Sequence, residues 1–184
     1  MVQFISPGEA KIIRASLVDV AAIGGIGIPL LLVLRLLAPI SHIPSGSMEP
    51  VLKEGDRVLV NNMQYLTKDP ERGDIVAFDS GFRGGLWNKE KVRFVKRVVG
   101  LPGDEVQILN GDVYINGQVL SDPYAVGHGD NIALVKVPFG HYFLMGDNRK
   151  RSYDSRYLGP IPAERIQGKV AFIARPSAFR LGLW

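Results

Sequence analysis

Apolar residues are concentrated in one run near the N-terminus. Residues 20–34 carry no charged side chain, and the apolar segment covers Leu17–Ile40 if Asp19 and Arg35 near its ends are allowed. About 20 helical residues cross the hydrocarbon core of a bilayer. The glycines and the proline of the run would weaken a soluble core helix, by about 1 kcal/mol for each glycine, whereas membrane helices tolerate them. The pattern therefore favours a transmembrane anchor over residues 17–40.

A buried core helix and a cleaved signal peptide are the other interpretations of this run. Lys11 and Arg14 provide the basic start of a signal peptide, but no A-x-A cleavage site follows the apolar residues. A retained anchor is therefore the preferred interpretation. Its orientation is not set by charge, because Lys11 and Arg14 before the run are matched by Lys53 and Arg57 after it.

Beyond the anchor, short runs rich in β-branched and aromatic residues alternate with Gly, Pro, Asn and Asp, which predicts a mostly β fold. Asn110-Gly111 and Asn116-Gly117 are strong signals for two-residue hairpin turns. Gly81–Asn88 and Asp122–Asn131 are predicted as surface loops, and Pro162–Ile166 as one turn of helix. The scarcity of amphipathic helical runs argues against a doubly wound α/β sheet. The predicted strands are Asp56–Val60, Asp74–Phe78, Val92–Val99, Glu105–Leu109, Asp112–Asn116, Ile132–Val137, His141–Met145 and Lys169–Arg175.

Composition limits the chemistry without naming a function. The chain has 184 residues, 46% of them hydrophobic and 22% charged, which is typical of one folded domain. It has no cysteine and only 3 histidines, so a disulfide and a cysteine nucleophile are excluded and little remains for a zinc site. The formal net charge of +4 would suit nucleic acid, anionic lipid or neither.

Two segments carry residues suited to nucleophilic catalysis. Ile43–Pro50 (IPSGSMEP) holds two serines and a glycine between prolines directly after the predicted anchor, although such a cluster is more often a linker. In the predicted strand Val92–Val99, period-two alternation places Lys96 on one face with Phe94 and Val98. Burial there would lower the pKa of Lys96 and make its amine a general base for a serine. The alternative is a lysine that snorkels out of the core at a solvated strand edge.

Four segments together carry a family resemblance. They are Ile43–Leu52 (IPSGSMEPVL), Arg72–Phe78 (RGDIVAF), Lys96–Asp104 (KRVVGLPGD) and Gly146–Gly159 (GDNRKRSYDSRYLG). Each is a weak signal alone, but in this order they resemble the signature boxes of the type I signal peptidases, or leader peptidases, which use a Ser–Lys dyad. The resemblance implies an antiparallel β fold after the transmembrane helix, with a catalytic β-domain over residues 41–184 and a reduced second β subdomain over residues 103–142.

The resemblance implies roles for individual residues. Ser47 corresponds to the nucleophile and Lys96 to the general base. The Ser45 side chain and the backbone N–H of Ser47 correspond to the oxyanion hole. Six further positions, which would fit a protein core equally well, match the family's substrate pocket: Ile43, Met48, Leu52, Ala77, Phe94 and Val95.

The last of the four segments implies supporting roles and contains a departure from the family. Ser152 corresponds to the serine that orients the lysine, and Asp154 and Arg156 to its supporting residues, although the latter two would also fit an ordinary ion pair. Where the family commonly reads G-D-N-R-D-N-S, Lys150 and Arg151 replace the Asp-Asn pair. We expect both side chains to point to solvent, and to lower the pKa of the base slightly if either lies near it.

The implied function is that of a membrane-bound serine endopeptidase that cleaves N-terminal signal peptides from exported preproteins after small-x-small (Ala-x-Ala) sites. The implied partners are preproteins and membrane lipid, with no nucleic acid, metal or cofactor. The implied location is the cell (inner) membrane, crossed once, with residues 1–16 in the cytoplasm and the catalytic domain outside it. The alternatives are a specialised conjugation or pilin maturation peptidase, a self-cleaving Ser–Lys repressor, which would need a DNA-binding domain in place of the anchor, and an inactive membrane-anchored binding module.

Overall fold

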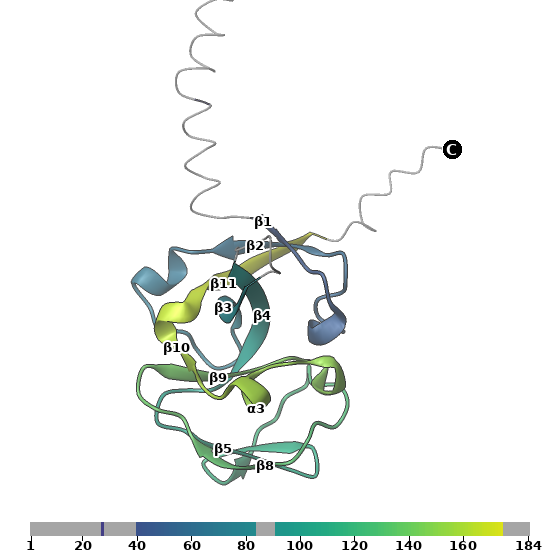
Figure 1. The fold of residues 1–184 in the computed structure, drawn as a ribbon, viewed down its shortest axis with the longest axis vertical. Helices are drawn as coiled ribbons and strands as arrows, with labels where there is room; N and C mark the ends of the chain where they lie inside the picture. The colour runs from purple at the N-terminus through teal and green to yellow at the C-terminus, as the bar shows by residue number, and fades with distance from the viewer. Residues whose placement is uncertain (1–26, 28–39, 84–90, 175–184) are drawn as a thin grey trace, which may run out of the picture. The chain divides into compact units, whose positions relative to one another are not determined.

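The computed structural model describes Gly27 and residues 40–83 and 91–174 (Figure 1). The chain divides into two units, residues 1–38 and 39–184, and all the strands described below lie in the second. The predicted anchor lies outside the described residues apart from Gly27 and Ile40, and Ile40 belongs to a β-strand. Among the residues that the structure describes, no helix has the length and apolar character needed to cross a membrane.

The larger of two antiparallel sheets has seven strands in the order β1-β2-β11-β3-β4-β9-β10. Strands β3 and β4 at its centre pair along most of their length, with Val76 opposite Lys96 and Ala77 opposite Val95. The sheet therefore places Lys96 on a strand with hydrogen-bonded neighbours on both sides. Its strands are β1 (Ile40–His42), β2 (Arg57–Asn61), β3 (Ile75–Arg83), β4 (Lys91–Gly100), β9 (His141–Met145), β10 (Ile161–Pro162) and β11 (Ile166–Ala174).

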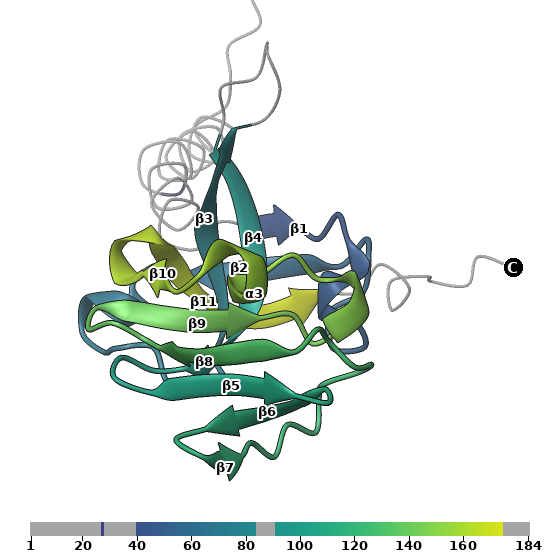
Figure 2. The same ribbon diagram turned by 60° about the horizontal axis from the view of Figure 1, so that its bottom comes forward.

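The second sheet has four strands in the order β7-β6-β5-β8, and Figure 2 shows it on the far side of β9 from β1 and β2. Both predicted hairpin turns are confirmed, because Asn110 and Asn116 have φ values of 53° and 52° and each precedes a glycine with positive φ. Strand β7 was not predicted, since two residues are too few to show an alternating pattern. The strands are β5 (Glu105–Leu109), β6 (Asp112–Ile115), β7 (Gln118–Val119) and β8 (Ile132–Lys136).

An apolar cluster joins the two sheets. It contains Val99 of β4, Phe143 of β9 and Val106 of β5, with other aliphatic residues of the second sheet around them. Gly100 ends β4 inside this cluster, and a Cβ there would lie 2.7 Å from Val106 Cγ2 and 2.8 Å from the Cβ of Phe143. Because real Cβ atoms do not approach other atoms so closely, only glycine lets the end of β4 pass the second sheet at this distance.

Short helical turns connect the strands, and one of them was predicted. The turn expected over Pro162–Ile166 is confirmed, since a 3₁₀ helix covers its centre. The predicted loop Asp122–Asn131 contains no named strand and forms one isolated bridge, between Val126 and Asn148. The helical turns are η2 (Gly46–Met48), η3 (Gln64–Leu66), η4 (Arg149–Arg151), α3 (Ser155–Leu158) and η5 (Ala163–Arg165).

The loop predicted over Gly81–Asn88 is wrong at its start, because β3 continues to Arg83. The Phe82 ring packs against Phe94 of β4, with 6.2 Å between the ring centroids, and the Ser80 hydroxyl donates a hydrogen bond to a β4 carbonyl. These contacts keep β3 beside β4 past the glycine that suggested a turn. The remainder of the predicted loop lies outside the described residues.

Candidate active site

Ser47 lies in the short helical turn η2, which apolar side chains fix to the sheet. Met48 and Leu52 are buried in a cluster with Ile43, Val58 and other residues. The Leu52 N–H donates to the Met48 carbonyl over 2.9 Å, and the Ile43 N–H donates to the carbonyl of Asp56 over 2.9 Å. The backbone before and after Ser47 is thereby held at both ends.

Lys96 is buried, which is one of the two placements that the strand alternation left open. Only 4% of Lys96 is exposed. Phe94 and Val98, which lie two residues before and after it on the same face of the strand, pack into one apolar cluster. The Lys96 ammonium lies 5.4 Å from the centroid of the Phe94 ring. The alternative of a lysine that snorkels to solvent is therefore wrong.

The Lys96 amine and the Ser47 hydroxyl are in direct contact, with 2.7 Å between Nζ and Oγ. Burial lowers the pKa of Lys96 to about 8, while the carboxylate of Asp154 acts in the opposite direction. A pKa near 8 leaves a useful fraction of the amine neutral at physiological pH, and only the neutral amine can accept a proton. The pair thus has the distance and the electrostatics of a nucleophile and its base.

Ser45 lies beside this pair. Its hydroxyl donates a hydrogen bond of 3.3 Å to Ser47 Oγ, and the residue is exposed to solvent. The Ser47 carbonyl is held by a separate contact, since the Asn148 N–H donates to it over 3.1 Å. Two hydroxyls and a buried amine therefore meet at one point, with Ser45 on the open side.

Ser152, Asp154 and Arg156 form one buried polar cluster. The Ser152 hydroxyl donates to Asp154 Oδ2 over 2.6 Å, and Arg156 Nε donates to Asp154 Oδ1 over 2.8 Å. The Arg156 side chain also donates to the Ser152 carbonyl. The hydrogen bonds described for the Ser152 side chain do not include one to Lys96. Instead, the charges of Asp154 and Arg156 act on the lysine pKa, in opposite directions.

Gly146 brings this cluster against the nucleophile. A Cβ on Gly146 would lie 2.2 Å from Ser152 Oγ and 2.5 Å from the Ser47 carbonyl oxygen. Both contacts are far below van der Waals distance, so any side chain would displace one of the two serines. The Gly146 N–H also donates to Asp154 Oδ2 over 2.9 Å. The glycine is therefore a spacer between the Ser152 cluster and Ser47.

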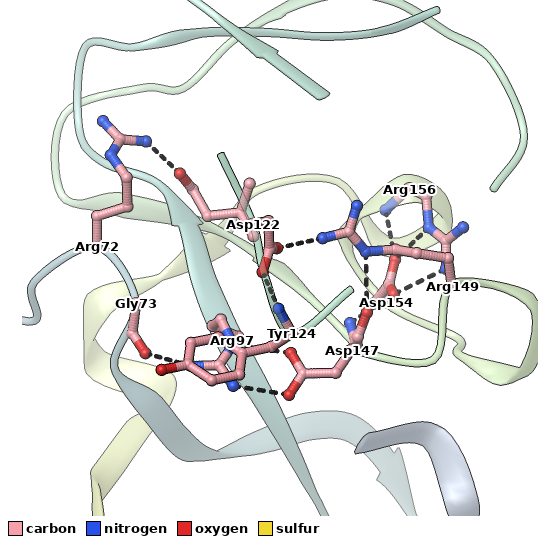
Figure 3. A network of polar contacts seen from close by, with 11 residues as sticks. Arg72, Gly73, Arg97, Asp122, Tyr124, Asp147, Arg149, Asp154 and Arg156 are labelled. Atoms are coloured by element: carbon pink, nitrogen blue, oxygen red, sulfur yellow. Dashed lines mark hydrogen bonds and ion pairs between the residues drawn. The ribbon is translucent and has the colours of Figure 1, made fainter. Parts of the chain in front are cut away.

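A second polar network, which sequence reasoning missed, supports the same region (Figure 3). Arg97, the neighbour of Lys96, makes two hydrogen bonds of 2.7 Å to the carboxylate of Asp147, and both side chains are buried. The Tyr124 ring covers the Arg97 guanidinium, 4.2 Å from its centroid. Arg149 pairs with Asp122 in the loop that carries Tyr124. The pattern of charged and apolar positions gives no signal for these pairs, because partners such as Arg97 and Asp147 lie far apart in the chain.

A pocket of about 580 Å³ opens over Ser47 and Lys96. Five of the six positions matched to a substrate pocket line it, and the sixth, Leu52, is fully buried beneath it in the core. The lining also includes Arg93, Arg151 and Tyr153, which sequence reasoning did not place there. The five matched positions are Ile43, Met48, Ala77, Phe94 and Val95.

Lys150 and Arg151, the two residues that depart from the family pattern, are placed differently. Both are exposed, as expected, but Arg151 also lines the pocket and its guanidinium lies 3.8 Å from the carboxylate of Glu49. Lys150 is outside the pocket and packs near Gly127. The expectation that the side chain faces solvent is therefore confirmed for Lys150. For Arg151 it is incomplete, because this side chain also lines the pocket.

The side chains that the structure describes around the pocket are suited to nucleophilic attack by a serine. The portion of the chain that the structure describes contains no group of three or more His, Asp or Glu residues that could hold a metal. What it brings together is a hydroxyl, a buried amine of lowered pKa and an open pocket lined largely by apolar groups. Such a site can attack a carbonyl carbon presented in the pocket and form an ester on Ser47.

Three known proteins that this chain resembles are named as signal peptidases. Residues 14–174 match the family model described as signal peptidase, peptidase S26. The chain is 42% identical over 148 residues to a probable signal peptidase I-2 of Synechocystis sp., covering 80% of this chain and 67% of that protein. It is 42% identical over 143 residues to a signal peptidase I of Bacillus licheniformis, covering 71% and 73%. A solved signal peptidase I structure from Enterococcus faecalis is 34% identical with a TM-score of 0.47, covering 56% of this chain and 97% of that one.

Proposed function

Because this chain belongs to the signal peptidase family, peptidase S26, and is a serine peptidase, we propose that it removes N-terminal signal peptides from exported preproteins. The observation that carries the proposal is the 2.7 Å contact between the Lys96 amine and the Ser47 hydroxyl. This contact brings together the hydroxyl and the amine that a Ser–Lys mechanism needs, and both residues line the pocket.

In the proposed first step, neutral Lys96 takes the proton of Ser47 while Ser47 Oγ attacks the carbonyl carbon before the scissile bond. The protonated lysine then gives this proton to the departing amine, which leaves as the new N-terminus of the mature protein. An acyl ester remains on Ser47. Water attacks the ester carbon and gives a proton to Lys96, the bond between the acyl group and Ser47 Oγ breaks, and Lys96 returns the proton to Oγ. The signal peptide leaves as a carboxylic acid, which ionises to the carboxylate.

The negative charge that develops on the carbonyl oxygen needs donors already in place. We assign this role to the Ser45 hydroxyl and the backbone N–H of Ser47. Support comes from the position of Ser45, whose hydroxyl lies 3.3 Å from Ser47 Oγ and so within reach of a group bound to it. An oxyanion at this point would replace the weak contact between the two serines.

Ser152, Asp154 and Arg156 are proposed to position the dyad. The Asp154 carboxylate is fully buried and accepts hydrogen bonds from Ser152, Gly146 and Arg156. Its charge is the largest of the contributions that raise the pKa of Lys96, and therefore limits how far burial lowers it. The cluster sets the electrostatic environment of the base without touching substrate.

The pocket is proposed to hold the residues on the N-terminal side of the scissile bond. Met48 and Ala77 line this pocket, with Ile43, Phe94 and Val95 completing an apolar wall. An apolar wall favours apolar side chains over charged ones. This supports apolar residues before the cut, and the family resemblance supplies the restriction to small-x-small sequences such as Ala-x-Ala.

Residues 17–40 are proposed to anchor the enzyme in the cell membrane, with the catalytic unit on the extracytoplasmic side and residues 1–16 in the cytoplasm. The support is the apolar run of the sequence, long enough to cross a bilayer. A substrate that is still held by its own membrane segment presents its cleavage site near the same surface. Anchoring both partners raises their effective concentration at the site.

The test is cleavage of a purified preprotein by the full-length chain in detergent, with the new N-terminus mapped by mass spectrometry. We expect one cut after a small-x-small sequence, and no cut with Ser47→Ala. A leucine at the residue before the cut should stop cleavage. The proposal fails if the intact chain leaves the preprotein uncut, or if Ser47→Ala cuts at the same rate.

A further inference from the structure

We propose that Arg151 is a specificity-determining residue, which favours substrates with a carboxylate side chain close to the scissile bond. The inference rests on the proposed function and deepens it, because it concerns the substrates of the same pocket. It starts from the unexpected position of Arg151, which sequence reasoning placed in solvent and which lines the pocket above Ser47 and Lys96.

The backbone fixes Arg151 relative to the nucleophile. The Arg151 N–H donates to the Asn148 carbonyl over 3.1 Å, and the Asn148 N–H donates to the Ser47 carbonyl over 3.1 Å. One residue further on, Ser152 is buried against Gly146 and Asp154. Arg151 is thus carried by a turn that is hydrogen-bonded to Ser47 itself, so its backbone keeps a constant place relative to the nucleophile.

The pocket has an unbalanced charge. Its lining includes Arg93, Lys96 and Arg151, and none of the described residues that line it is an Asp or a Glu. Lys96 is neutral in the proposed reaction, and Arg93 stands opposite Asp79 in the pairing of β4 with β3. Of the two exposed arginines in the lining, Arg151 is the one whose turn is hydrogen-bonded to Ser47.

The partner that Arg151 has in the structure is weakly held. The guanidinium of Arg151 is 3.8 Å from the Glu49 carboxylate, at the upper limit for an ion pair, and the two side chains are 64% and 37% exposed. Exposed pairs of this kind contribute little to stability. A substrate carboxylate that enters the pocket can therefore replace Glu49 or share the guanidinium with it, at small cost.

The expected preference for a carboxylate is that of an exposed ion pair between the substrate and Arg151. Double-mutant measurements of such pairs correspond to a preference of about two- to fivefold. Salt should reduce it, because the Debye length falls from about 10 Å at 0.1 M to about 3 Å at 1 M. The preference should be strongest for positions within a few residues of the cut, where the distance to Arg151 is shortest.

The experiment uses synthetic peptides with one small-x-small site and either Asp or Asn at each of the three positions on either side of the cut. Binding is measured with full-length Ser47→Ala protein in detergent, so that it does not depend on turnover, and kcat/KM with the intact enzyme. Arg151→Asn removes the charge. Lys150→Asn is the matched control, because it removes the same charge one residue away and outside the pocket.

At one or more positions, we expect the Asp peptide to be preferred over the Asn peptide by about two- to fivefold at low salt. The preference should disappear in Arg151→Asn and at 1 M salt, persist in Lys150→Asn and increase in Glu49→Gln, which frees the guanidinium. Equal binding of all Asp and Asn pairs, or a preference that Arg151→Asn and Lys150→Asn reduce alike, overturns the inference. Failure of the intact enzyme to cut any peptide overturns the proposed function instead, while the binding data still decide the role of Arg151.

Discussion

The region around Ser47 and the second sheet differ in the polar groups that they bury. Near Ser47 an apolar cluster lies beside several buried polar or charged side chains, which include Lys96, Arg97, Asp147 and Asp154. The cluster that joins the second sheet to β4 and β9 is entirely aliphatic or aromatic apart from the sulfur of Met145. The first region holds groups in a fixed geometry, and the second supplies apolar burial.

This difference has an energetic basis. Apolar burial stabilises the fold by about 25 cal/mol per Å² of area removed from water. Buried ion pairs such as Arg97 with Asp147 contribute little net stability, because desolvation offsets their attraction, although loss of one partner is costly. Substitutions of the reacting groups near Ser47 should therefore change the chemistry, whereas substitutions in the second sheet should change stability and leave the chemistry of the folded protein intact.

The largest effect is expected at the proposed dyad. Ser47→Ala and Lys96→Met should each lower kcat by about 10⁴-fold or more, and the double variant should lose little further, because the two groups act as a unit. Lys96→Met should also stay folded, since burial already disfavours the charged form of this lysine. Single-turnover cleavage and thermal unfolding measure the two properties. Near-normal turnover of Lys96→Met would remove the lysine from the mechanism.

A smaller loss of activity is expected at Ser45, whose hydroxyl is assigned to the oxyanion. Ser45→Ala should lower kcat by about 10²–10³-fold with little change in KM, because the donor acts mainly in the transition state. Stability should hardly change, since Ser45 is exposed. Ser45→Thr retains a hydroxyl and is the control. If Ser45→Ala is as active as the unaltered chain, the donor must be another group.

Ile108→Ala tests the second sheet, because it shortens a side chain in the core of that sheet. Ile108 is only 1% exposed. The free energy of unfolding should fall by about 2–5 kcal/mol, as for other buried aliphatic residues cut to alanine. The kcat of the protein that remains folded should not change. Leu134→Ala in β8 is the matched control, because Leu134 is 56% exposed and its loss should cost little. A large fall in kcat for Ile108→Ala would show that the two regions are coupled.

The sequence predicts the second sheet better than the surroundings of Ser47, for a physical reason. In that sheet β5 matches its predicted bounds, β6 and β8 each end one residue earlier than predicted, and the Asn-Gly turns are confirmed, because alternation and turn chemistry are local properties of the chain. Strands β1, β7 and β10 have two or three residues each, and tertiary pairing rather than local pattern defines them.

The polar network around Ser47 shows the limit of local patterns. Alternation correctly places Lys96 on one face with apolar neighbours but leaves its burial open. Its contact with Ser47 joins residues 49 positions apart, and Arg97 meets Asp147 across 50. The family resemblance implies roles for Ser47 and Lys96 but none for Arg97, although Arg97 and Asp147 both lie in segments that carry the resemblance. It also matched Leu52 to the pocket, where the structure has a core residue, because packing depth is not a property of a motif.

A pH dependence should belong to the Ser47 region alone. Burial lowers the pKa of Lys96 to about 8, and the neutral amine is the active form. kcat/KM should therefore rise with pH, by about tenfold for each unit below this value, and level off above it. Ile108→Val in the second sheet should leave the midpoint unchanged. Cleavage rates from pH 6 to pH 10, at subsaturating substrate, measure the profile.

Two further variants identify the group that titrates. The Asp154 carboxylate raises the pKa of Lys96, so Asp154→Asn, which keeps the shape of the side chain, should move the midpoint to lower pH. His42 lines the same pocket and is the histidine best placed to imitate such a profile. An unperturbed histidine titrates near 6.5. The Ser–Lys assignment would be wrong, and the base would be a histidine, if His42→Gln abolished the rise of kcat/KM with pH. The same conclusion would follow if the midpoint lay near 6.5 and did not respond to Asp154→Asn. An unchanged rise in His42→Gln leaves Lys96 as the titrating group.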